Sequence, residues 1–461
     1  MNVQNHYLEI CQYTGEPFPL YGKRIRKINH LFFAKLLAGE NAIKYFTNKG
    51  WMQFNGNLWT IIAPEKIKIK IRNLILHVAR EYEVDIYAQI TCGILEEILK
   101  MAQLELYGEV FPRLDPNIIP VKNGVLTWDD RSQQFKFSEY TPEVFVSSTL
   151  NVNYVPNAPC DFFVEKLQEI MPDEDDRRVA LEYCGAALFS QNFTRKILLL
   201  QGEGGCGKTT LPLLLTSLLG QNRVFDLNIQ AIGRDYELAA LEEQTLLTAS
   251  EAVSGVLCSA GSEWIKKIVG RDFIQTRQKF RNERVDHFGT FSLTIVTNNR
   301  IRLAFEGRGY EWRDRLIPIF FNHHIEKTDK MLIERLLTEN GPGILNCLLE
   351  AAERVRKNNW EIELSPNQII RRDNLVAMSK PVEAFVRKYI VRSFGNDLPS
   401  QRAFECYVKV RKQSGLPSLE AQVFYKNLAK AMDEIFQASI RNSLKTSHGT
   451  MRGYRGFKLI C

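Results

Sequence analysis

The sequence predicts a mixed α/β protein in three parts, and three observations support this. Helical periodicity dominates the N-terminal part (residues 1–155), which also contains a small β-hairpin region. Short apolar runs alternate with helices in the middle part (156–345), as in a parallel sheet covered on both faces. Cations accumulate in the C-terminal part (346–461), where a helical connector precedes helices and a final β-ribbon.

Composition excludes several classes of protein. The 461 residues suffice for about three domains, and 45% hydrophobic with 25% charged residues is typical of a globular protein. No apolar run reaches the roughly 20 residues of a membrane helix, and the start lacks the order of a secretory signal. Nine cysteines without a CxxC pair favour reduced thiols over a disulfide framework or a zinc cluster. We therefore expect a cytoplasmic protein without a membrane partner.

Three segments ahead of the first apolar run carry clear patterns. Apolar residues at three- and four-residue spacing predict mostly helix over Phe32–Gln103. Turn signals between alternating runs predict a hairpin-like region at Val121–Pro142. A further helical stretch, Asp161–Ser190, leads into the middle part.

Four near-continuous apolar runs are the expected strands of the middle part. They are KILLLQ (Lys196–Gln201), QTLLTAS (Gln244–Ser250), FSLTIVT (Phe291–Thr297) and RLIPIFF (Arg315–Phe321). Such runs are typical of strands buried on both faces of a parallel sheet.

A glycine-rich loop follows the first of these strands. The stretch GEGGCGKT (Gly202–Thr209) fits the pattern G-x-x-x-x-G-K-[ST], with a strand expected before it and a helix after it. Glycines allow backbone N–H groups to turn inward, and these donors form an anion site together with the helix N-terminus. We therefore predict a phosphate-binding P-loop made of Gly202, Gly204, Gly205, Cys206, Gly207, Lys208, Thr209 and Thr210.

The residue types around this loop indicate ATP and Mg²⁺ as cofactors. Lys208 is expected to reach the β- and γ-phosphates, and Thr209 to offer its hydroxyl group to Mg²⁺. Glu251 directly follows the second apolar run, where its carboxylate would orient and polarise the attacking water. Asn298, at the end of the third run, would hold that water near the γ-phosphate. An exposed loop glutamate and a simple turn asparagine are the alternatives for these two positions.

The C-terminal part is basic. From Arg371 to Cys461 there are 17 Lys and Arg against 7 Asp and Glu, a net charge of +10 in a chain of net charge +7. This is typical of a module that binds a polyanion, but a solvated basic face without a partner fits the charge equally well. Helices followed by the ribbon Ser443–Ile460 predict a winged helix.

The order of these motifs resembles the superfamily 3 AAA+ helicases of the poxvirus and phage or plasmid primase-helicase type. The matching segments are GEGGCGKTT, the single acid in LLTASE, KKIVGRDFIQTRQKF, FSLTIVTNN and EWRDRLIPIF. NIIPVKNGVLTWDD and LNVNYVPNAPCDFFVEKL resemble the helical domain ahead of the ATPase, and RGYRGFKLI resembles the final winged helix. The resemblance covers roughly residues 30 to 461 and implies an α/β P-loop AAA+ ATPase core.

The resemblance also implies homo-oligomeric rings, usually hexamers, with ATP bound between subunits. An arginine of the neighbouring subunit then stabilises charge on the leaving γ-phosphoryl group. Arg315 fits this finger position best and Arg313 is second, although by sequence alone both are equally well read as surface charges. With Lys208, Glu251 and Asn298 they are the expected catalytic residues.

Members of this family thread single-stranded DNA through the ring, held by a loop that corresponds here to Lys266–Arg284. The residues expected to contact DNA are Lys266, Arg277, Lys279, Phe280 and Arg281. Cations with an interleaved aromatic side chain follow a phosphate backbone without reading bases, and a solvated basic hairpin is the alternative. Gly270-Arg271-Asp272 departs from the family's Gly-Gly-Asp, which puts the geometry of the loop in question.

Relatives often carry a primase domain, but the residues before Asn123 contain no paired-acid D-x-D strand for a two-metal site. We therefore expect no primase activity and a separate primase or polymerase as a partner.

The leading interpretation is an ATP-dependent, ring-forming replicative DNA helicase of a phage, plasmid or mobile element. It would act on single-stranded and forked DNA in the host cytoplasm or nucleoid, with 3′-to-5′ movement implied by the family. One alternative is an ATP-switched origin-binding or helicase-loader protein that separates no strands. A P-loop signalling ATPase that binds no nucleic acid is another.

Overall fold

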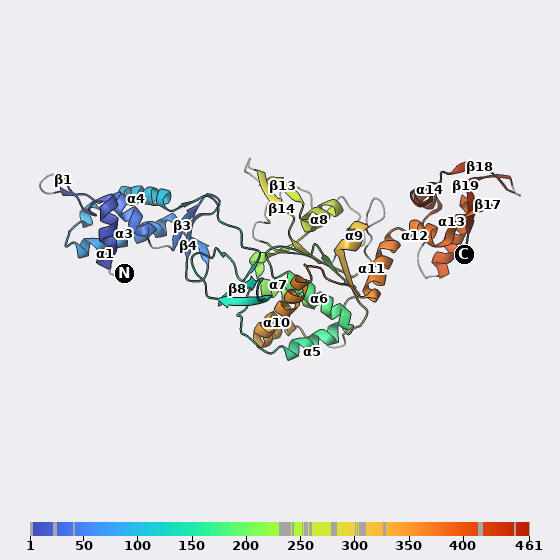
Figure 1. The fold of residues 1–461 in the computed structure, drawn as a ribbon, viewed down its shortest axis with the longest axis horizontal. Helices are drawn as coiled ribbons and strands as arrows, with labels where there is room; N and C mark the ends of the chain where they lie inside the picture. The colour runs from blue at the N-terminus through green and yellow to red at the C-terminus, as the bar shows by residue number, and fades with distance from the viewer. Residues whose placement is uncertain are drawn as a thin grey trace.

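The computed structural model shows three parts that follow one another along the long axis of the molecule, with the termini at opposite ends (Figure 1). The structure describes all residues except 1–2, 22–24, 40–41, 230–240, 242–243, 251, 253–256, 258–260, 278–283, 300, 302, 304–309, 326–328, 414–417, 447–448 and 461. Within these described residues, no helix combines the length and apolar character that crossing a membrane requires.

The N-terminal part combines helices with a small sheet. Its helices are α1 (Val3–Thr14), α2 (His30–Ala38), α3 (Pro64–Glu81) and α4 (Cys92–Glu105), with a 3-10 turn η1 (Tyr87–Gln89). Its sheet has the order β5 (Trp59–Ile61), β4 (Gly50–Phe54), β3 (Ile43–Phe46) and β6 (Tyr107–Gly108), and a ribbon pairs β1 (Leu20–Tyr21) with β2 (Ile25–Arg26).

The prediction of mostly helix over Phe32–Gln103 agrees with α2, α3 and α4, but the sequence pattern did not indicate the strands of this sheet. Strands β3, β4 and β5 have only four, five and three residues. An alternating pattern this short gives too few positions to stand out against the helical spacing on either side of it.

The hairpin-like region is confirmed as a three-stranded antiparallel sheet. Its strands are β7 (Ile118–Val121), β8 (Gly124–Asp129) and β9 (Gln134–Ser138). Ile119 and Leu126 are fully buried in the same hydrophobic cluster as Leu198 of the middle part. This small sheet therefore packs against the middle part.

The middle part is built on a parallel sheet of five strands. Its order is β11 (Val224–Asp226), β12 (Leu246–Ala249), β15 (Ser292–Thr297), β10 (Ile197–Gly202) and β16 (Leu316–Phe321). The four apolar runs are confirmed as strands. β11, with three residues, was not expected.

Helices cover both faces of this sheet, which explains the continuous apolar runs. On one face lie α5 (Asp161–Ile170), α6 (Glu174–Ala186), α7 (Thr210–Leu219) and α10 (Leu332–Lys357). On the other lie α8 (Gly261–Gly270), α9 (Tyr310–Arg315) and α11 (Pro366–Ser379). Leu198 and Leu200 of β10 are buried in the first cluster, and Ile197 and Leu199 in the second. Successive side chains of a strand point to opposite faces, so every side chain in this run is covered.

Two further features belong to the middle part. A two-stranded antiparallel hairpin, β13 (Phe273–Arg277) with β14 (Arg284–Phe288), projects from it beside α8 (Figure 1). A short 3-10 turn, η2 (Gln221–Arg223), joins α7 to β11. Helix α10 runs through residue 345, and the first hydrophobic cluster continues to Ile362.

The C-terminal part has its own hydrophobic core. Its elements are α12 (Pro381–Tyr389), β17 (Ile390–Pro399), α13 (Ser400–Gln413), α14 (Ala421–Phe436), β18 (Arg441–Thr446) and β19 (Gly449–Leu459). The strands form an antiparallel sheet of order β17-β19-β18, so the expected ribbon is confirmed as β18 and β19. Phe385, Tyr407 and Phe424 pack with Tyr454 beneath this sheet. The expectation of reduced thiols agrees with six free cysteines among the described residues, but Cys406 is disulfide-bonded, because linear spacing cannot show which cysteines the fold brings together.

Candidate phosphate-binding site

The glycine loop lies between the end of β10 and the start of α7. Gly205 and Gly207 have φ angles of 79° and 76°, a left-handed backbone that glycine adopts without the steric cost of a Cβ atom. Helix α7 begins at Thr210, and its first N–H groups have no partner within the helix. The loop and the helix start therefore together supply the donors of an anion site.

Two side chains bind the loop from within. Lys208 is only 7% exposed, and its Nζ donates to the backbone oxygen of Glu203 at 2.7 Å. The Sγ of the buried Cys206 donates to the same oxygen at 2.8 Å. The ammonium group of Lys208 thus lies against its own loop, where a phosphate oxygen would exchange with the carbonyl as acceptor.

The segment after β16 packs against this loop. The Ile325 N–H donates to the Gly205 carbonyl at 3.1 Å. A Cβ atom on Gly205 would lie 2.8 Å from His324, and one on Gly207 would lie 2.6 Å from Ile325. Sequence reasoning did not single out His324, because it belongs to no motif and only the parallel pairing of β16 with β10 brings it here.

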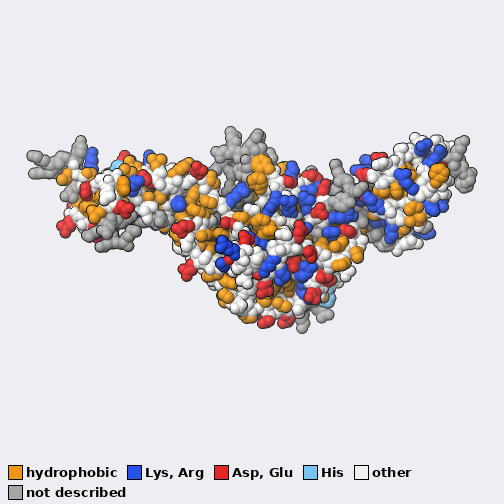
Figure 2. Space-filling model, in the orientation of Figure 1, with side chains coloured by type: hydrophobic (Ala, Val, Ile, Leu, Met, Phe, Trp, Pro, Cys, Tyr) orange, Lys and Arg blue, Asp and Glu red, His pale blue; other side chains and the backbone are white. Residues whose placement is uncertain are grey.

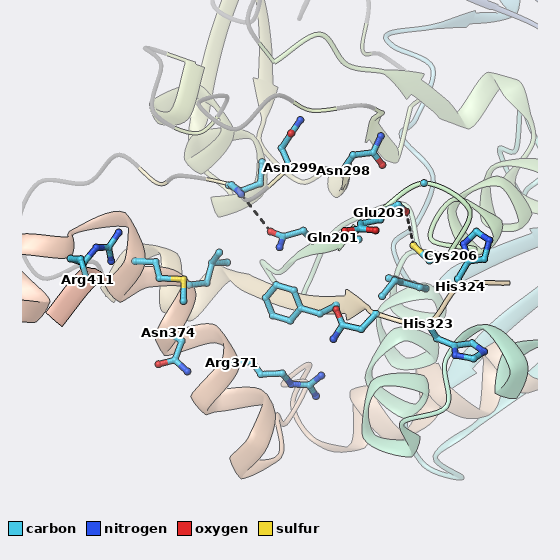
Figure 3. Close-up of a pocket in the computed structure, with 18 residues that line it drawn as sticks. Gln201, Glu203, Cys206, Asn298, Asn299, His323, His324, Arg371, Asn374 and Arg411 are labelled. Atoms are coloured by element: carbon cyan, nitrogen blue, oxygen red, sulfur yellow. Dashed lines mark hydrogen bonds between the residues drawn. The ribbon is translucent and has the colours of Figure 1, made fainter. Parts of the chain in front are cut away.

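Asn298 lies at the same end of the parallel strands as the glycine loop. Gln201 of β10 pairs with Thr297 of β15, and Asn298 is the next residue. Figure 3 shows its side chain beside the loop that carries Glu203. The Thr297 hydroxyl donates to the Ala252 carbonyl at 2.6 Å, which joins the end of β15 to the residue after Glu251. Glu251 itself lies outside the described residues.

Thr209 lies at the start of α7. It occupies the N-cap position of α7, and its side chain makes no capping hydrogen bond. No cluster of three His, Cys, Asp or Glu side chains that could hold a metal occurs in the part of the chain that the structure describes. A magnesium ion at this loop would therefore depend on the Thr209 hydroxyl, phosphate oxygens and water, which are the hard oxygen ligands that it accepts.

A cavity of about 820 Å³ opens beside the loop (Figure 3), within the range of roughly 300–1,000 Å³ that small-molecule sites occupy. Its walls come from the glycine loop, the ends of β15 and β16, and helix α11. Two arginines also line it, Arg371 of α11 and Arg411 of α13 in the C-terminal part. Neither residue could be predicted from the sequence, because both lie more than 100 residues after the loop and outside any nucleotide motif.

Arg371 is fixed by a buried carboxylate. Its guanidinium group donates to both oxygens of Asp176, each at 2.8 Å. Asp176 is 3% exposed and also accepts from Gln368 Nε2 at 2.8 Å. This bidentate pair joins α11 to α6 and orients one cation of the cavity wall.

Arg313 and Arg315 lie near the start of β16, at the opposite end of the parallel strands from the glycine loop. Arg315 is one residue before β16, whose Leu316 pairs with Ile197 at the start of β10. At about 3.3 Å per residue, the six residues of the strand separate it from the loop by roughly 20 Å. Arg315 Nη1 donates to the Glu311 carbonyl at 2.9 Å, and Arg313 Nε lies 3.4 Å from Asp373 Oδ1. The structure therefore does not bring these two residues to the glycine loop of the same chain.

Lys266 is held by carboxylates. Its Nζ lies 2.7 Å from both Glu263 and Glu311 and 5.6 Å from the centre of the Trp312 ring. Burial lowers its pKa, but the hydrogen bonds to the two glutamates raise the pKa above its ordinary value overall. The positive charge of Lys266 is thus balanced within this subunit.

The other predicted DNA contacts fall where the structure gives no side-chain position. Arg277 ends β13, but its side chain is not described, and Lys279, Phe280 and Arg281 lie outside the described residues. Arg271 stands where the family has a glycine, and the structure shows how the turn accommodates it. Arg271 has a φ of 70°, donates its N–H to the Gly289 carbonyl at 2.8 Å, and places its guanidinium group 4.7 Å from the centre of the Phe193 ring. The turn at the base of the hairpin therefore forms with an arginine in it.

Comparisons with known proteins concern the domain ahead of the sheet and the whole fold. Residues 30–172 match a family model described as D5 N terminal like. An A-form apo structure of the NrS-1 C-terminal region aligns with a TM-score of 0.51 at 12% identity, covering 93% of this chain and 100% of that one. A further apo structure of this NrS-1 region aligns with a TM-score of 0.50 at 12% identity, covering 93% and 99%. No curated protein matches the chain.

At such low identity the two structures establish a shared fold and nothing more. The D5 match agrees with the resemblance noted for the segments ahead of the parallel sheet.

Proposed function

We propose that the chain is an ATPase with a P-loop AAA+ core. The observation that carries this proposal is the strand, glycine loop and helix at Ile197–Leu219, with Asn298 at the same sheet edge and a cavity beside both. Lys208 would donate to the β- and γ-phosphates, and Thr209 would hold Mg²⁺. Bound Mg²⁺ would neutralise charge on the phosphates. Glu251 would orient the attacking water, and Asn298 would hold it in line.

The proposed enzyme is a homo-oligomeric ring, with six subunits as the family implies. Arg315, with Arg313 as second choice, would supply the positive charge that stabilises the departing γ-phosphoryl group. Arg315 is separated from the glycine loop of its own chain by roughly 20 Å, which exceeds the reach of an arginine side chain. This separation supports action on the site of the neighbouring subunit. The nucleotide would then lie between two copies of the chain.

The proposed work of this ring is the separation of DNA strands, as in superfamily 3 helicases. The hairpin β13–β14 projects from the sheet as a loop that tracks single-stranded DNA would need to (Figure 1). Arg277, Lys279, Phe280 and Arg281 are its proposed DNA contacts. In the C-terminal part, the order helix, strand, two helices and two strands supports a DNA-binding winged helix, as does the excess of 14 Lys and Arg over 6 Asp and Glu from Pro381 to Cys461. The match of residues 30–172 to the D5 N terminal like model supports the family resemblance from which this proposed work is taken.

Lys208→Ala tests the ATPase step. We expect loss of ATP hydrolysis and of strand displacement on a forked duplex, because the variant lacks the cation that faces the phosphates. Lys122→Ala is the matched control, since Lys122 is an exposed lysine in the turn between β7 and β8. Far-ultraviolet circular dichroism should show that both variants are folded. Normal ATP turnover by folded Lys208→Ala would disprove the proposed site.

A second experiment separates the helicase from an ATP-switched protein without unwinding activity. Lys279→Ala combined with Arg281→Ala should keep basal ATPase activity and lose both stimulation by DNA and strand displacement. If the wild-type protein hydrolyses ATP and binds DNA but displaces no strand, the switch is the correct function. If the double variant unwinds at the wild-type rate, the hairpin is not the translocating loop.

A further inference from the structure

The C-terminal sheet carries an outward bulge at one edge. Strands β17 and β19 pair as Arg392 with Phe457 and then as Asp397 with Arg455. Four residues, 393–396, thus stand opposite the single residue Gly456, so the β17 backbone must arch away from the sheet. Gly395 has a φ of 80°, and the Asn396 side chain donates to the Ser393 hydroxyl at 2.9 Å across the arch. The bulge is therefore a closed, hydrogen-bonded turn.

The side chain at this arch contributes nothing to the core. Phe394 has a relative exposure of 105%, the highest among the exposed large hydrophobic side chains of the described residues. Burying a phenylalanine stabilises a fold by about 1.5–3 kcal/mol, so the fold gains nothing from this residue as it stands. Single exposed apolar residues are common, and the meaning of Phe394 therefore depends on its surroundings.

Those surroundings are cationic. Among the side chains that the structure describes, the exposed cations of the sheet are Arg392, Arg441, Arg452, Arg455 and Lys458. Arg392 and Arg455 flank the bulge directly, at its two paired ends. The acidic residue of these strands is Asp397, which lies 3.8 Å from Arg455. Figure 2 shows Lys and Arg side chains over this end of the molecule with few Asp and Glu.

Two contacts fix the side chain of Arg392, the last paired residue of β17 before the bulge. The Arg392 guanidinium group lies 5.8 Å from the centre of the Phe457 ring and donates to the Phe436 carbonyl. Its position is thus set by the domain core before any ligand binds. An ordered cation two residues before a free aromatic ring suits a ligand that alternates negative charge with flat apolar faces, which is the repeat of single-stranded DNA.

We propose that this bulge is a second DNA contact of the chain, in which Phe394 stacks on an unpaired or end-exposed base while Arg392, Arg455 and Lys458 bind the neighbouring phosphates. The inference rests on the proposed function only in taking DNA as the polyanion. An aromatic ring can stack only where a base face is open, so the contact selects single strands and fork junctions over continuous duplex. The basic hairpin and this bulge would then hold two points of one strand.

Fluorescence anisotropy without nucleotide tests the proposal. The probe is a fluorescein-labelled forked duplex at low salt, and an unlabelled, covalently closed circular duplex serves as competitor to measure duplex affinity. Phe394→Ala should bind the fork about 5- to 100-fold more weakly, because stacking on a base contributes about 1–3 kcal/mol. Phe394→Trp should bind within about threefold of wild type, since tryptophan also stacks. The affinity for the closed duplex should change little in both.

Val423→Ala is the matched control, an exposed apolar residue of the same domain on α14, and it should leave fork binding unchanged. Equal binding by wild type and Phe394→Ala overturns the proposal. An equal loss of affinity for the fork and for the closed duplex also overturns it. So does a change in the oligomeric state of Phe394→Ala without a change in its DNA affinity. Basal ATPase activity should stay at the wild-type level in Phe394→Ala, so this failure is distinct from failure of the proposed ATPase.

Discussion

The glycine loop of the middle part and the bulge of the C-terminal part use the same backbone conformation in opposite settings. Gly207 and Gly395 have φ angles of 76° and 80°. A Cβ atom on Gly207 would lie within 3 Å of Ile325 and Ile170, whereas one on Gly395 would have nothing within 4 Å. The loop needs glycine for both conformation and space, and the bulge needs it for conformation alone. The glycine loop is therefore part of the packed core, whereas the bulge is a surface feature that extends from the core of the C-terminal part.

Charged groups follow the same division. Arg371 and Lys266 of the middle part are held by carboxylates at 2.7 to 2.8 Å. Arg455 of the C-terminal sheet has its carboxylate partner at 3.8 Å and is exposed. Substitutions in the middle part should therefore alter stability together with function, and those in the C-terminal sheet should alter binding with a smaller loss of stability.

The largest effect is expected at Asp176. Asp176→Ala should lower the free energy of unfolding by about 3–5 kcal/mol, because it leaves Arg371 and Gln368 without their buried acceptor. Asp397→Ala removes the exposed pair with Arg455 and should cost about 0–1 kcal/mol. Urea unfolding followed by circular dichroism measures both. Similar losses for the two variants would contradict the contrast between the two parts.

The two glycines give the next largest contrast. Gly207→Ala should lower the free energy of unfolding by about 2–3 kcal/mol, from the left-handed backbone and from contact with Ile325. It should also weaken ATP binding, which titration with a fluorescent ATP analogue measures. Gly395→Ala meets only the backbone term and should cost about 1 kcal/mol, with ATP binding unchanged. Equal losses of stability would mean that the packing against Gly207 carries no weight.

These contrasts also show which features a sequence can reveal. The strands around the loop were predictable, because burial on both faces forces continuous apolar runs such as Ile197–Gln201. The loop was predictable, since a phosphate cradle demands glycines at fixed spacing. The sheet of the N-terminal part was missed, because strands of three to five residues carry too little alternation.

The contacts between distant residues could not be predicted. Asp176 and Arg371 are 195 residues apart in sequence, and no local pattern marks them as partners. The partners of Lys266 were hidden for a similar reason, since Glu311 lies on another helix. Its role as a DNA contact stays a prediction that the observed ion pairs now oppose. Glu251 and the residues Lys279–Arg281 lie outside the described residues, so their roles remain proposals from sequence.

Lys266 allows a direct choice between an ion-paired and a DNA-contacting residue. Lys266→Ala should lower the free energy of unfolding by about 1 kcal/mol, because the pairs with Glu263 and Glu311 are partly exposed. Affinity for single-stranded DNA should change less than threefold, whereas Lys279→Ala with Arg281→Ala should weaken it more. Anisotropy and urea unfolding measure the two quantities. A tenfold loss of DNA affinity in folded Lys266→Ala would restore Lys266 to the DNA-contacting set.

The smallest effect is expected at Arg455, and it concerns salt dependence. Each phosphate that a cation neutralises releases counterions and adds about 0.7 to the slope of log affinity against log salt for a single strand. Arg455→Gln should therefore lower this slope by less than about 0.7, because Asp397 already shares the charge. Asp397→Asn should raise affinity about twofold at low salt by releasing Arg455 from that partner. Lys430→Gln is the control and should leave the slope unchanged. Lys430 lies on α14, its side chain is 62% exposed, and its Nζ is 3.9 Å from Glu434. An unchanged slope in Arg455→Gln would place the bound strand away from the sheet that carries the bulge.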